Sequence, residues 1–325
     1  MKAIVCERYG PPEVLKIREV EKPTARDNEV LIKIHATTVN SGDTRIRAVR
    51  VPLGFGLLVR LGMGFSGPRQ PILGFELAGE VEAVGKDVTR FKPGDKVFGS
   101  AGFAFGCYAE YRALPESGAL APVPENLTDA EAASLCFGGT TALYYLRRGK
   151  LQRGEKLLIN GASGAVGTAA IQIAKHLGAE VTAVCSTANL ELVKSLGADR
   201  VVDYTKADFT ANGETYDVIM DNVGNAPFSR VRKSLKNGGR FLMVIGNLPE
   251  QIQANFQKQV VSAAAKGEDL VNAETISRIA DLGRSRALKP VIDRTYPFEE
   301  IVEAHRYVDT GRKRGSVVIT LPQGS

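Results

Sequence analysis

Short β-type runs dominate the first 125 residues of the chain. Apolar and β-branched residues recur in brief stretches, and Pro or Gly interrupts them about every ten residues, as in a small β-barrel or sandwich. The clearest stretches are residues 2–9, 30–36 and 77–84. Residues 92–95 (Lys-Pro-Gly-Asp) predict a turn, because Pro presets φ and Gly supplies a positive φ.

The pattern changes at about residue 126, where helical and strand periodicities begin to alternate. Thr128 and Glu131 form a capping-box pattern that predicts a helix start. Strands are predicted at 156–160, 181–185, 201–202, 218–220 and 241–245, with a turn at 237–239 and helices at 166–177 and 190–196. Such alternation predicts a doubly wound α/β domain with parallel strands. Residues 291–293 and 316–321 return to β character and are expected to rejoin the first domain.

Composition and length narrow the function classes. At roughly 100–200 residues per domain, 325 residues predict two domains. The net charge of +6 favours anionic partners without selecting among phosphates, nucleic acids and lipid surfaces. The four cysteines stand apart in sequence with no C-x-x-C, which argues against a zinc ribbon or a disulfide framework. A reducing, cytoplasmic compartment is therefore expected.

The strongest chemical motif is a glycine-rich loop between a predicted strand and a predicted helix. Its residues are Gly161, Ala162, Ser163, Gly164, Ala165, Val166 and Gly167. In a dinucleotide-binding unit, the first glycine allows the tight turn, the second lets the backbone approach a pyrophosphate, and the third lets helix and strand pack closely. The helix N-terminus adds free N–H groups and positive potential. The loop therefore predicts a dinucleotide site.

The end of the next predicted strand favours NADPH over NADH. An NAD site needs a carboxylate there to hold the ribose 2′-hydroxyl. The strand ends at Cys185 and is followed by Ser186, Thr187, Ala188 and Asn189, with no acid before Glu191. Ser186 and Asn189 could hydrogen-bond a 2′-phosphate, although Ser186 also suits a helix N-cap.

Other catalytic motifs are absent. The glycine loop does not match G-x-S-x-G, and no Tyr is followed four residues later by Lys. His35, His176 and His305 are each expected to be structural rather than a general base.

The segment between Asp43 and Glu76 contains no acidic residue. It carries apolar side chains, several glycines and the arginines Arg45, Arg47, Arg50, Arg60 and Arg69. We interpret residues 51–70 as a loop that closes over a pocket and shapes substrate entry. The alternative is peripheral contact with an anionic membrane through residues 50–68.

Motifs spread over the whole chain match one known family. They are residues 1–5 (MKAIV), 39–43 (VNSGD), 77–81 (LAGEV), 84–85 (VG), 91–99 (FKPGDKVFG), 108–111 (YAEY), 160–167 (NGASGAVG) and 196–199 (LGAD). On these motifs the chain resembles the medium-chain dehydrogenase/reductase superfamily, in its zinc-free, quinone-oxidoreductase-like branch. The resemblance implies a GroES-like β-barrel catalytic domain (residues 1–125 and 290–325) and a doubly wound Rossmann domain that binds NADP (residues 126–289). The active site would lie in the cleft between them.

Two departures from the zinc-dependent members indicate the branch. Those members carry Cys where this chain has Asn40 and His where it has Phe75. No metal site is therefore expected. Without a Lewis acid, polarising a ketone or alcohol oxygen is difficult. Hydride delivery to a quinone or to the β-carbon of an enone remains feasible, because the product anion is stabilised by conjugation.

The resemblance also implies roles for individual residues. Asn40 and Asp43 would be the catalytic residues near the nicotinamide and its ribose, with Asn40 as a polar anchor and no dedicated general acid; Asp43 also suits a turn cap. The residues expected to contact the cofactor are Thr141, Tyr204 (which also suits a packing role), Asn222, Val223, Gly246, Asn247 and Arg312 or Arg314. Ala188 and Ser316 stand where relatives often carry Arg and Lys, which weakens the NADPH assignment slightly.

These observations predict an NADPH-dependent oxidoreductase that reduces quinones or the C=C bond of α,β-unsaturated carbonyls without metal. The alternatives are a zinc-free alcohol dehydrogenase and a cofactor-binding regulatory or peripheral membrane protein. No nucleic-acid partner is expected, because the basic segment lacks interleaved aromatic side chains. The resemblance makes a homodimer a further possibility.

Overall fold

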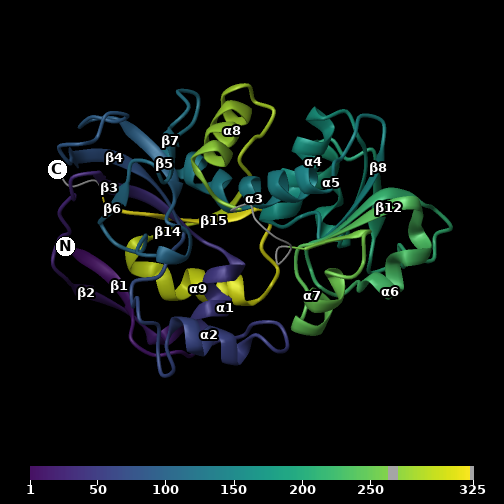
Figure 1. The fold of residues 1–325 in the computed structure, drawn as a ribbon, viewed down its shortest axis with the longest axis horizontal. Helices are drawn as coiled ribbons and strands as arrows, with labels where there is room; N and C mark the ends of the chain where they lie inside the picture. Colours follow the sequence, from purple (N-terminus) through teal and green to yellow (C-terminus); the bar gives the residue numbers. More distant parts are fainter. Residues whose placement is uncertain (263–269, 323–325) are drawn as a thin grey trace.

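The computed structural model describes residues 1–262 and 270–322, and it consists of two domains. The strand-rich domain carries both chain ends, and the α/β domain lies beside it (Figure 1). This arrangement confirms the predicted fold class, a β-barrel domain combined with a doubly wound domain.

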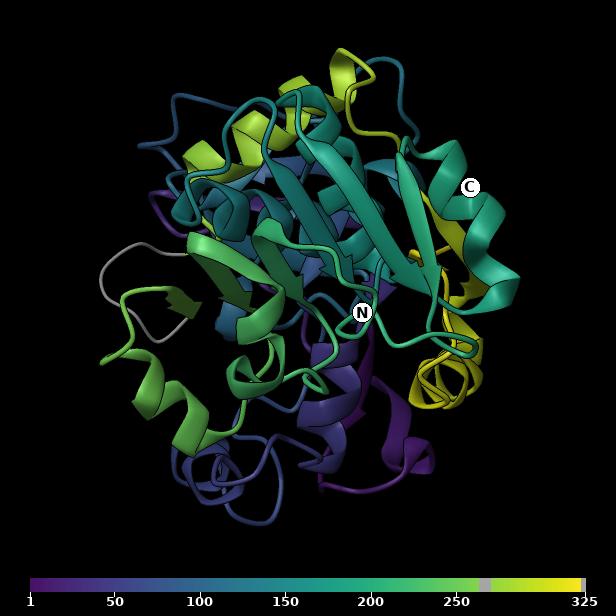
Figure 2. The same cartoon turned by 90° about the vertical axis from the view of Figure 1, so that its right-hand side faces the viewer.

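The α/β domain is built on a parallel sheet. Its strands are β8 (Lys156–Asn160), β9 (Glu180–Cys185), β10 (Arg200–Asp203), β11 (Tyr216–Asp221), β12 (Leu235–Met243) and β13 (Val260–Ser262). Within the described residues the order is β10-β9-β8-β11-β12-β13, and every pair is parallel (Figure 2). This is the Rossmann strand order. Successive strands are added outward on one side of β8 up to β10 and then on the other side from β11, so the switch point lies between β8 and β11. A ligand is therefore expected outside the carboxyl ends of those two strands.

The barrel domain is mostly antiparallel. Its strands are β1 (Lys2–Cys6), β2 (Leu15–Glu19), β3 (Glu29–Val39), β4 (Glu76–Val84), β5 (Lys96–Ser100), β6 (Tyr111–Pro115), β7 (Ala119–Pro122), β14 (Ile292–Pro297) and β15 (Ser316–Thr320). The last strand, β15, pairs with β3, and β14 pairs with β15. The predicted return of the C-terminal segment to the first domain is confirmed.

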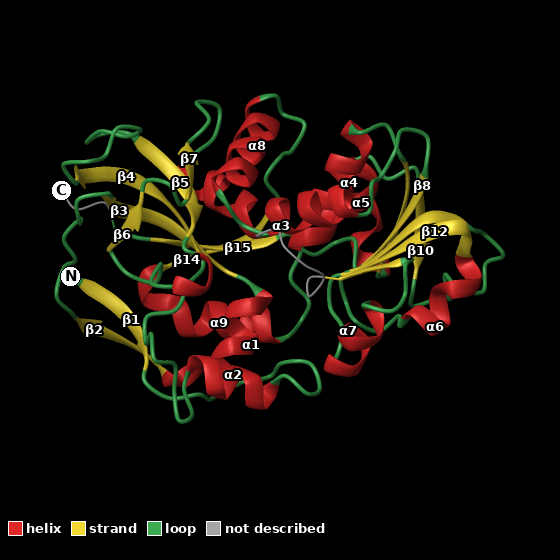
Figure 3. Cartoon of the chain, viewed as in Figure 1, coloured by secondary structure: helices red, strands yellow, loops and turns green. Residues whose placement is uncertain are grey.

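Helices cover the sheets and join the domains (Figure 3). They are α1 (Ser41–Ala48), α2 (Gly56–Met63), α3 (Asp129–Arg148), α4 (Ala165–His176), α5 (Leu190–Ser195), α6 (Phe228–Val231), α7 (Leu248–Ala254), α8 (Ala273–Arg284) and α9 (Ile301–Asp309). The capping box predicted at Thr128 and Glu131 starts α3. Helix α3 packs against α4 on one side and against β3 and β4 on the other, so one apolar core spans both domains. No described helix is long and apolar enough to cross a membrane.

Two strand predictions were wrong in their limits. Strand β1 ends at Cys6 rather than at residue 9. Strand β12 runs through the predicted turn at 237–239 and ends at Met243, before the predicted limit of 245. Gly238 does adopt the positive φ of 77° that a turn residue favours. The ladder to β11 shifts register there, which accommodates the irregular backbone within the strand.

A buried ion pair joins α1 to α9. The Arg47 guanidinium is fully buried, and its Nη2 donates to Asp309 Oδ2 at 2.6 Å. Arg50 binds the same carboxylate oxygen from the protein surface at 2.7 Å. Two arginines of the predicted basic surface therefore share one carboxylate, which leaves a net charge of one, and Arg47 is absent from that surface.

Replacing Asp309 should destabilise the barrel domain strongly. Asp309→Asn leaves the Arg47 charge buried without a counterion, which costs about 3–5 kcal/mol in the free energy of unfolding. Denaturant unfolding measures this loss. Asp281→Asn, which breaks an exposed pair with Arg284, is the matched control and should change stability by less than about 1 kcal/mol. Equal losses of stability in the two variants would show that the buried Arg47–Asp309 pair matters no more than an exposed pair.

Candidate active site

The glycine loop lies at the switch point, between the carboxyl end of β8 and the start of α4. Gly161 has a φ of 75°, which favours glycine. A Cβ on Gly167 would lie 2.3 Å from the Gly161 carbonyl oxygen, so only glycine allows this close packing. Gly164 is the N-cap of α4, whose first turn begins at Ala165 and Val166 without any side-chain cap. The helix N-terminus is thus available to an anion.

Polar side chains gather at the ends of β9 and β10, next to the loop. Asn189 Nδ2 donates to Ser163 Oγ at 3.1 Å and to Ser186 Oγ at 3.3 Å. Tyr204 follows β10 with 62% of its surface exposed, which makes a pure packing role unsuitable. The structure therefore brings the predicted 2′-phosphate residues together.

Asp203 is a carboxylate that the sequence reasoning overlooked at this edge. Its oxygens accept hydrogen bonds from the hydroxyls of Thr187 and Thr205. These hydrogen bonds lower the pKa of the Asp203 carboxyl, which keeps it charged. It ends β10 rather than β9, so it does not occupy the position at which an NAD site carries its acid.

The end of β11 presents an amide with free hydrogen-bonding capacity. Both Asn222 side-chain atoms, Oδ1 and Nδ2, are buried and have no partner among the described residues. Val223 beside it is 45% exposed. The turn is held by buried Asp221, which accepts from the backbone N–H groups of Val223 and Ala226. Because Asp221 binds these groups, the Asn222 amide remains free for a ligand.

Thr141 offers a second unsatisfied group. It lies in the middle of α3, is only 5% exposed, and its Oγ1 has no partner among the described residues. The preceding Thr140 hydroxyl instead donates to the Cys136 carbonyl within the helix. Buried polar atoms without partners are rare in native proteins, so Thr141 and Asn222 indicate a missing polar partner.

Gly246 and Asn247 follow β12, but the side chain of Asn247 has a structural function. Its Oδ1 accepts from the Glu250 backbone N–H at 2.9 Å and caps α7. The residue lies beyond the carboxyl edge of β12, as predicted. Its amide oxygen is occupied, so a contact with the cofactor would have to use its remaining N–H donors or its backbone.

Asn40 also functions as a helix cap. Its Oδ1 accepts from the backbone N–H groups of Gly42 and Asp43, and the Asp43 carboxylate accepts from the Asn40 backbone N–H at 2.9 Å. Asn40 Nδ2 lies 3.2 Å from both carboxylate oxygens of Glu76. The Asn40 side chain, predicted as a polar anchor, is thus bound on both sides by the protein, and the turn-cap alternative for Asp43 is confirmed.

A buried acidic cluster lies behind Asn40. Glu76 is 1% exposed and also accepts a hydrogen bond from Thr38 Oγ1. Burial raises the pKa of the Glu76 carboxyl to about 7. Burial and the neighbouring Glu76 charge also raise the pKa of Asp43 well above its usual range. Both carboxyls disfavour their charged forms, so this buried cluster carries less negative charge than two ordinary carboxylates would.

The three histidines lie outside this arrangement. His35 Nδ1 is 2.8 Å from Asp129 Oδ2 at the start of α3, and His176 is exposed at the end of α4. His305 is fully buried against Tyr108, and burial lowers its pKa well below the usual value. These surroundings agree with the structural roles expected of them.

The connection between α9 and β15 places Lys313 near the glycine loop, whereas Arg312 or Arg314 was predicted to contact the cofactor. Arg312 is exposed, and Arg314 is bound to Asp293 at 3.3 Å. Lys313 between them is half-buried, and Gly315 donates its N–H to the Ser163 carbonyl at 2.8 Å. The sequence reasoning missed Lys313 because only this long-range contact distinguishes it from its neighbours.

Residues 50–68 reach across to the Rossmann domain. The Leu248 backbone N–H donates to the Leu53 carbonyl at 2.9 Å, and Gly54 packs directly on Leu248. Helix α2 in this segment has no buried residue, and its Leu57 side chain is 64% exposed. The segment therefore contacts both domains, but it contains helix α2 where a loop was expected. Closure over a pocket stays a prediction.

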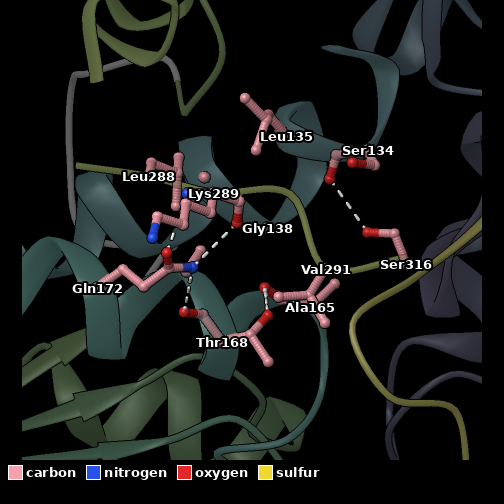
Figure 4. Close-up of a pocket in the computed structure, with 12 residues that line it drawn as sticks. Ser134, Leu135, Gly138, Ala165, Thr168, Gln172, Leu288, Lys289, Val291 and Ser316 are labelled. Atoms are coloured by element: carbon pink, nitrogen blue, oxygen red, sulfur yellow. Dashed lines mark hydrogen bonds between the residues drawn. The ribbon is translucent and has the colours of Figure 1, made fainter. Parts of the chain in front are cut away.

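Figure 4 shows a small pocket at the junction of α3, α4 and the strand β15. Gln172 bridges the Thr168 and Lys289 carbonyls, and the Ser316 hydroxyl donates to the Ser134 carbonyl at 3.0 Å. The space is too small for a cofactor, so we regard it as part of the contact between the domains.

Comparison with known proteins supports the assignment of the two domains to the dehydrogenase/reductase fold. The family model of the alcohol dehydrogenase GroES-like domain matches residues 26–125, and that of a zinc-binding dehydrogenase matches residues 196–319. The 2-methylene-furan-3-one reductase of Solanum lycopersicum is 34% identical over 331 residues, which cover 98% of this chain and 79% of that protein.

Solved structures agree over nearly the whole chain. The quinone oxidoreductase of Coxiella burnetii has a TM-score of 0.86 at 31% identity and covers 99% of both chains. A mycobacterial protein solved in complex with NADPH has a TM-score of 0.80 at 29% identity, over 98% of this chain and 100% of that one. The chain belongs to the medium-chain dehydrogenase/reductase superfamily, and these relatives place it in the quinone-oxidoreductase-like branch.

Within this superfamily the metal positions are informative. In the described part of the chain, no group of three or more His, Cys, Asp or Glu side chains could hold a metal ion. Asn40 and Phe75, which the family resemblance matches to zinc-ligand positions, both have other contacts. Asn40 binds Glu76, and Phe75 packs edge-on against Phe105 with ring centroids 4.8 Å apart.

The buried Glu76 carboxyl should make stability depend on pH. Its folded-state pKa of about 7 lies above the value of 4.5 for a free carboxyl, so its contribution is complete at low pH and disappears as pH rises through 7. Thermal melting between about pH 4.5 and 7 should therefore show that the wild type loses more stability with rising pH than Glu76→Gln does. Glu82→Gln, at an exposed position of the same strand, should follow the wild type. If the stability of the wild type and of Glu76→Gln changes with pH in parallel, the Glu76 carboxyl does not cause the pH dependence.

Proposed function

We propose that this chain is an NADPH-dependent oxidoreductase that transfers hydride to quinones or to the C=C bond of α,β-unsaturated carbonyls. The observation that carries the proposal is the set of unsatisfied groups around the switch point. The α4 N-terminus has no side-chain cap, and Thr141 and Asn222 are buried without partners. The names of the relatives, a furanone reductase and a quinone oxidoreductase, support the same reaction class.

The residues at the cleft fit a dinucleotide. The glycine loop would bind the pyrophosphate through its backbone N–H groups. A Cβ at Gly161 would collide with Val223 and one at Gly167 with the Gly161 carbonyl, so the tight turn that presents these groups requires glycine. Ser186 and Asn189 would bind the 2′-phosphate, next to the exposed ring of Tyr204. Thr141 and Asn222 would bind polar groups at the nicotinamide end. When bound, the cofactor supplies the hydride, and the protein supplies orientation and a site that excludes water.

The substrate end of the site favours conjugated acceptors and catalysis without metal. Phe75, Phe103 and Phe105 form an edge-to-face aromatic cluster, and Phe75 packs beside Gly42, close to Asn40. Phe103 is 80% exposed and available to a flat apolar molecule. Such a surface binds quinone or enone planes, whose product anions need little electrostatic stabilisation.

Three further expectations remain proposals. A cytoplasmic location fits four buried free cysteines. Peripheral membrane contact fits the exposed apolar side chains of α2, although Arg47 is buried and both Arg47 and Arg50 are paired with Asp309. Homodimer formation fits the family.

Turnover measurements test the reaction class. NADPH oxidation should occur with quinones and with short and long enones, and a chelator should leave the rates unchanged. Elemental analysis should find far less than one zinc per chain. Zinc-free alcohol dehydrogenase activity is the competing outcome: turnover of alcohols or simple ketones, without turnover of quinones or enones, would replace the proposal.

A carboxylate placed at the end of β9 should reverse the cofactor preference. Ser186→Asp would repel a 2′-phosphate and accept a ribose hydroxyl, so the KM for NADPH should rise about tenfold or more and the KM for NADH should fall. Ser195→Asp, at an exposed position in α5, is the matched control and should leave both constants unchanged. Equal use of NADH and NADPH by the wild type would contradict the phosphate assignment.

A further inference from the structure

Lys313 connects the two domains at the start of the glycine loop. Its Nζ donates to the Gly315 carbonyl oxygen at 2.6 Å. Gly315 in turn donates its N–H to the Ser163 carbonyl and forms a β-bridge with Gly164, the N-cap of α4. The ammonium therefore lies near the N-terminus of α4, although Lys313 itself leads into the last strand of the barrel domain.

This ammonium has no counterion among the described residues. The two carboxylates whose charges influence it, Asp293 and Glu76, are already bound by other groups. Asp293 accepts from the Tyr307 hydroxyl and the Arg314 backbone, and Glu76 accepts from Asn40 and Thr38. Lysine has three N–H donors and Lys313 uses one of them, so two remain for a ligand.

Two positive potentials meet at this place. The N-terminus of α4 carries the positive end of the helix dipole, and the Lys313 ammonium adds a full charge beside it. Burial lowers the pKa of Lys313 to about 8, which shows that the charge is poorly solvated. An anionic group between them would offset both, through charge-assisted hydrogen bonds from either side.

We propose that Lys313 binds the pyrophosphate of the dinucleotide cofactor from the catalytic-domain side, opposite the N-terminus of α4. The assignment rests on the proposed function. The exposed Arg312 and the ion-paired Arg314 lack this placement, so Lys313 is the cation of this connection that lies beside the start of α4. The 2′-phosphate site at Ser186 is separate, because Lys313 reaches the start of α4 rather than the end of β9. The bound pyrophosphate thereby links the two domains.

Cofactor binding to the full chain tests the assignment without turnover. Titrations with NADPH and with NADH, followed by nicotinamide fluorescence, give the Kd of each. Lys313→Met should raise both Kd values by a similar factor of about ten or more, because the pyrophosphate is common to both cofactors. The wild-type Kd should also rise as pH increases through about 8, and this dependence should disappear in Lys313→Met.

Controls separate the possible outcomes. Lys313→Arg should retain most of the affinity, and Lys233→Met, which removes an exposed charge in the turn after α6, should bind as the wild type does. Melting curves without cofactor check that the variants fold. A loss for NADPH alone would move the contact to the 2′-phosphate and overturn the proposal, as would unchanged binding. Failure of the wild type to bind either cofactor would instead refute the proposed function.

Discussion

The backbone contact between Gly315 and the glycine loop determines how the two halves of the site meet. Gly315 binds Ser163 and Gly164 on the cofactor domain, and the next residues form β15 in the barrel domain. Strand β15 pairs with β3, so that Val317 lies opposite Val39, the residue before Asn40. A short path of hydrogen-bonded backbone thus connects the α4 N-terminus to the start of α1. The phosphate end and the substrate end are held in fixed relation, which hydride transfer requires because the reacting atoms must be placed within a fraction of an ångström.

The Glu76 carboxyl is buried without a cation in direct contact among the described residues, and neutral donors bind it instead. Glu76 would be costly as a charge in so apolar a setting. Asn40 and Thr38 donate hydrogen bonds to it, and its raised pKa allows it to carry a proton at neutral pH. Asn40 is itself fixed by the capping box with Asp43. Asn40 therefore holds the start of α1 and the Glu76 carboxyl in place, so its side chain belongs to the scaffold.

Local sequence signals predicted the parts of the structure that depend on neighbours along the chain. The strand at 156–160, the glycine loop and the helix after it were found because turn, dipole and periodicity signals coincide there. The capping roles of Asn40 and Asn247 are also local, yet the family resemblance directed attention to ligand contacts instead. Lys313 and the burial of Arg47 could not be read from the sequence. Their surroundings come from residues more than a hundred positions away, and composition alone makes both look like surface charges.

These features together describe a site whose charges lie at one end. The cofactor end offers glycine N–H groups and the ammonium of Lys313, whereas the substrate end offers Phe75, the exposed ring of Phe103 and two carboxyls that favour their neutral form. Affinity for an acceptor must then come from apolar area and shape, at about 25 cal/mol per Å². An apolar pocket distinguishes one methylene by only about 1–3 kcal/mol. On the proposed function, such a site would discriminate among acceptors by their flatness and conjugation more than by the identity of their substituents.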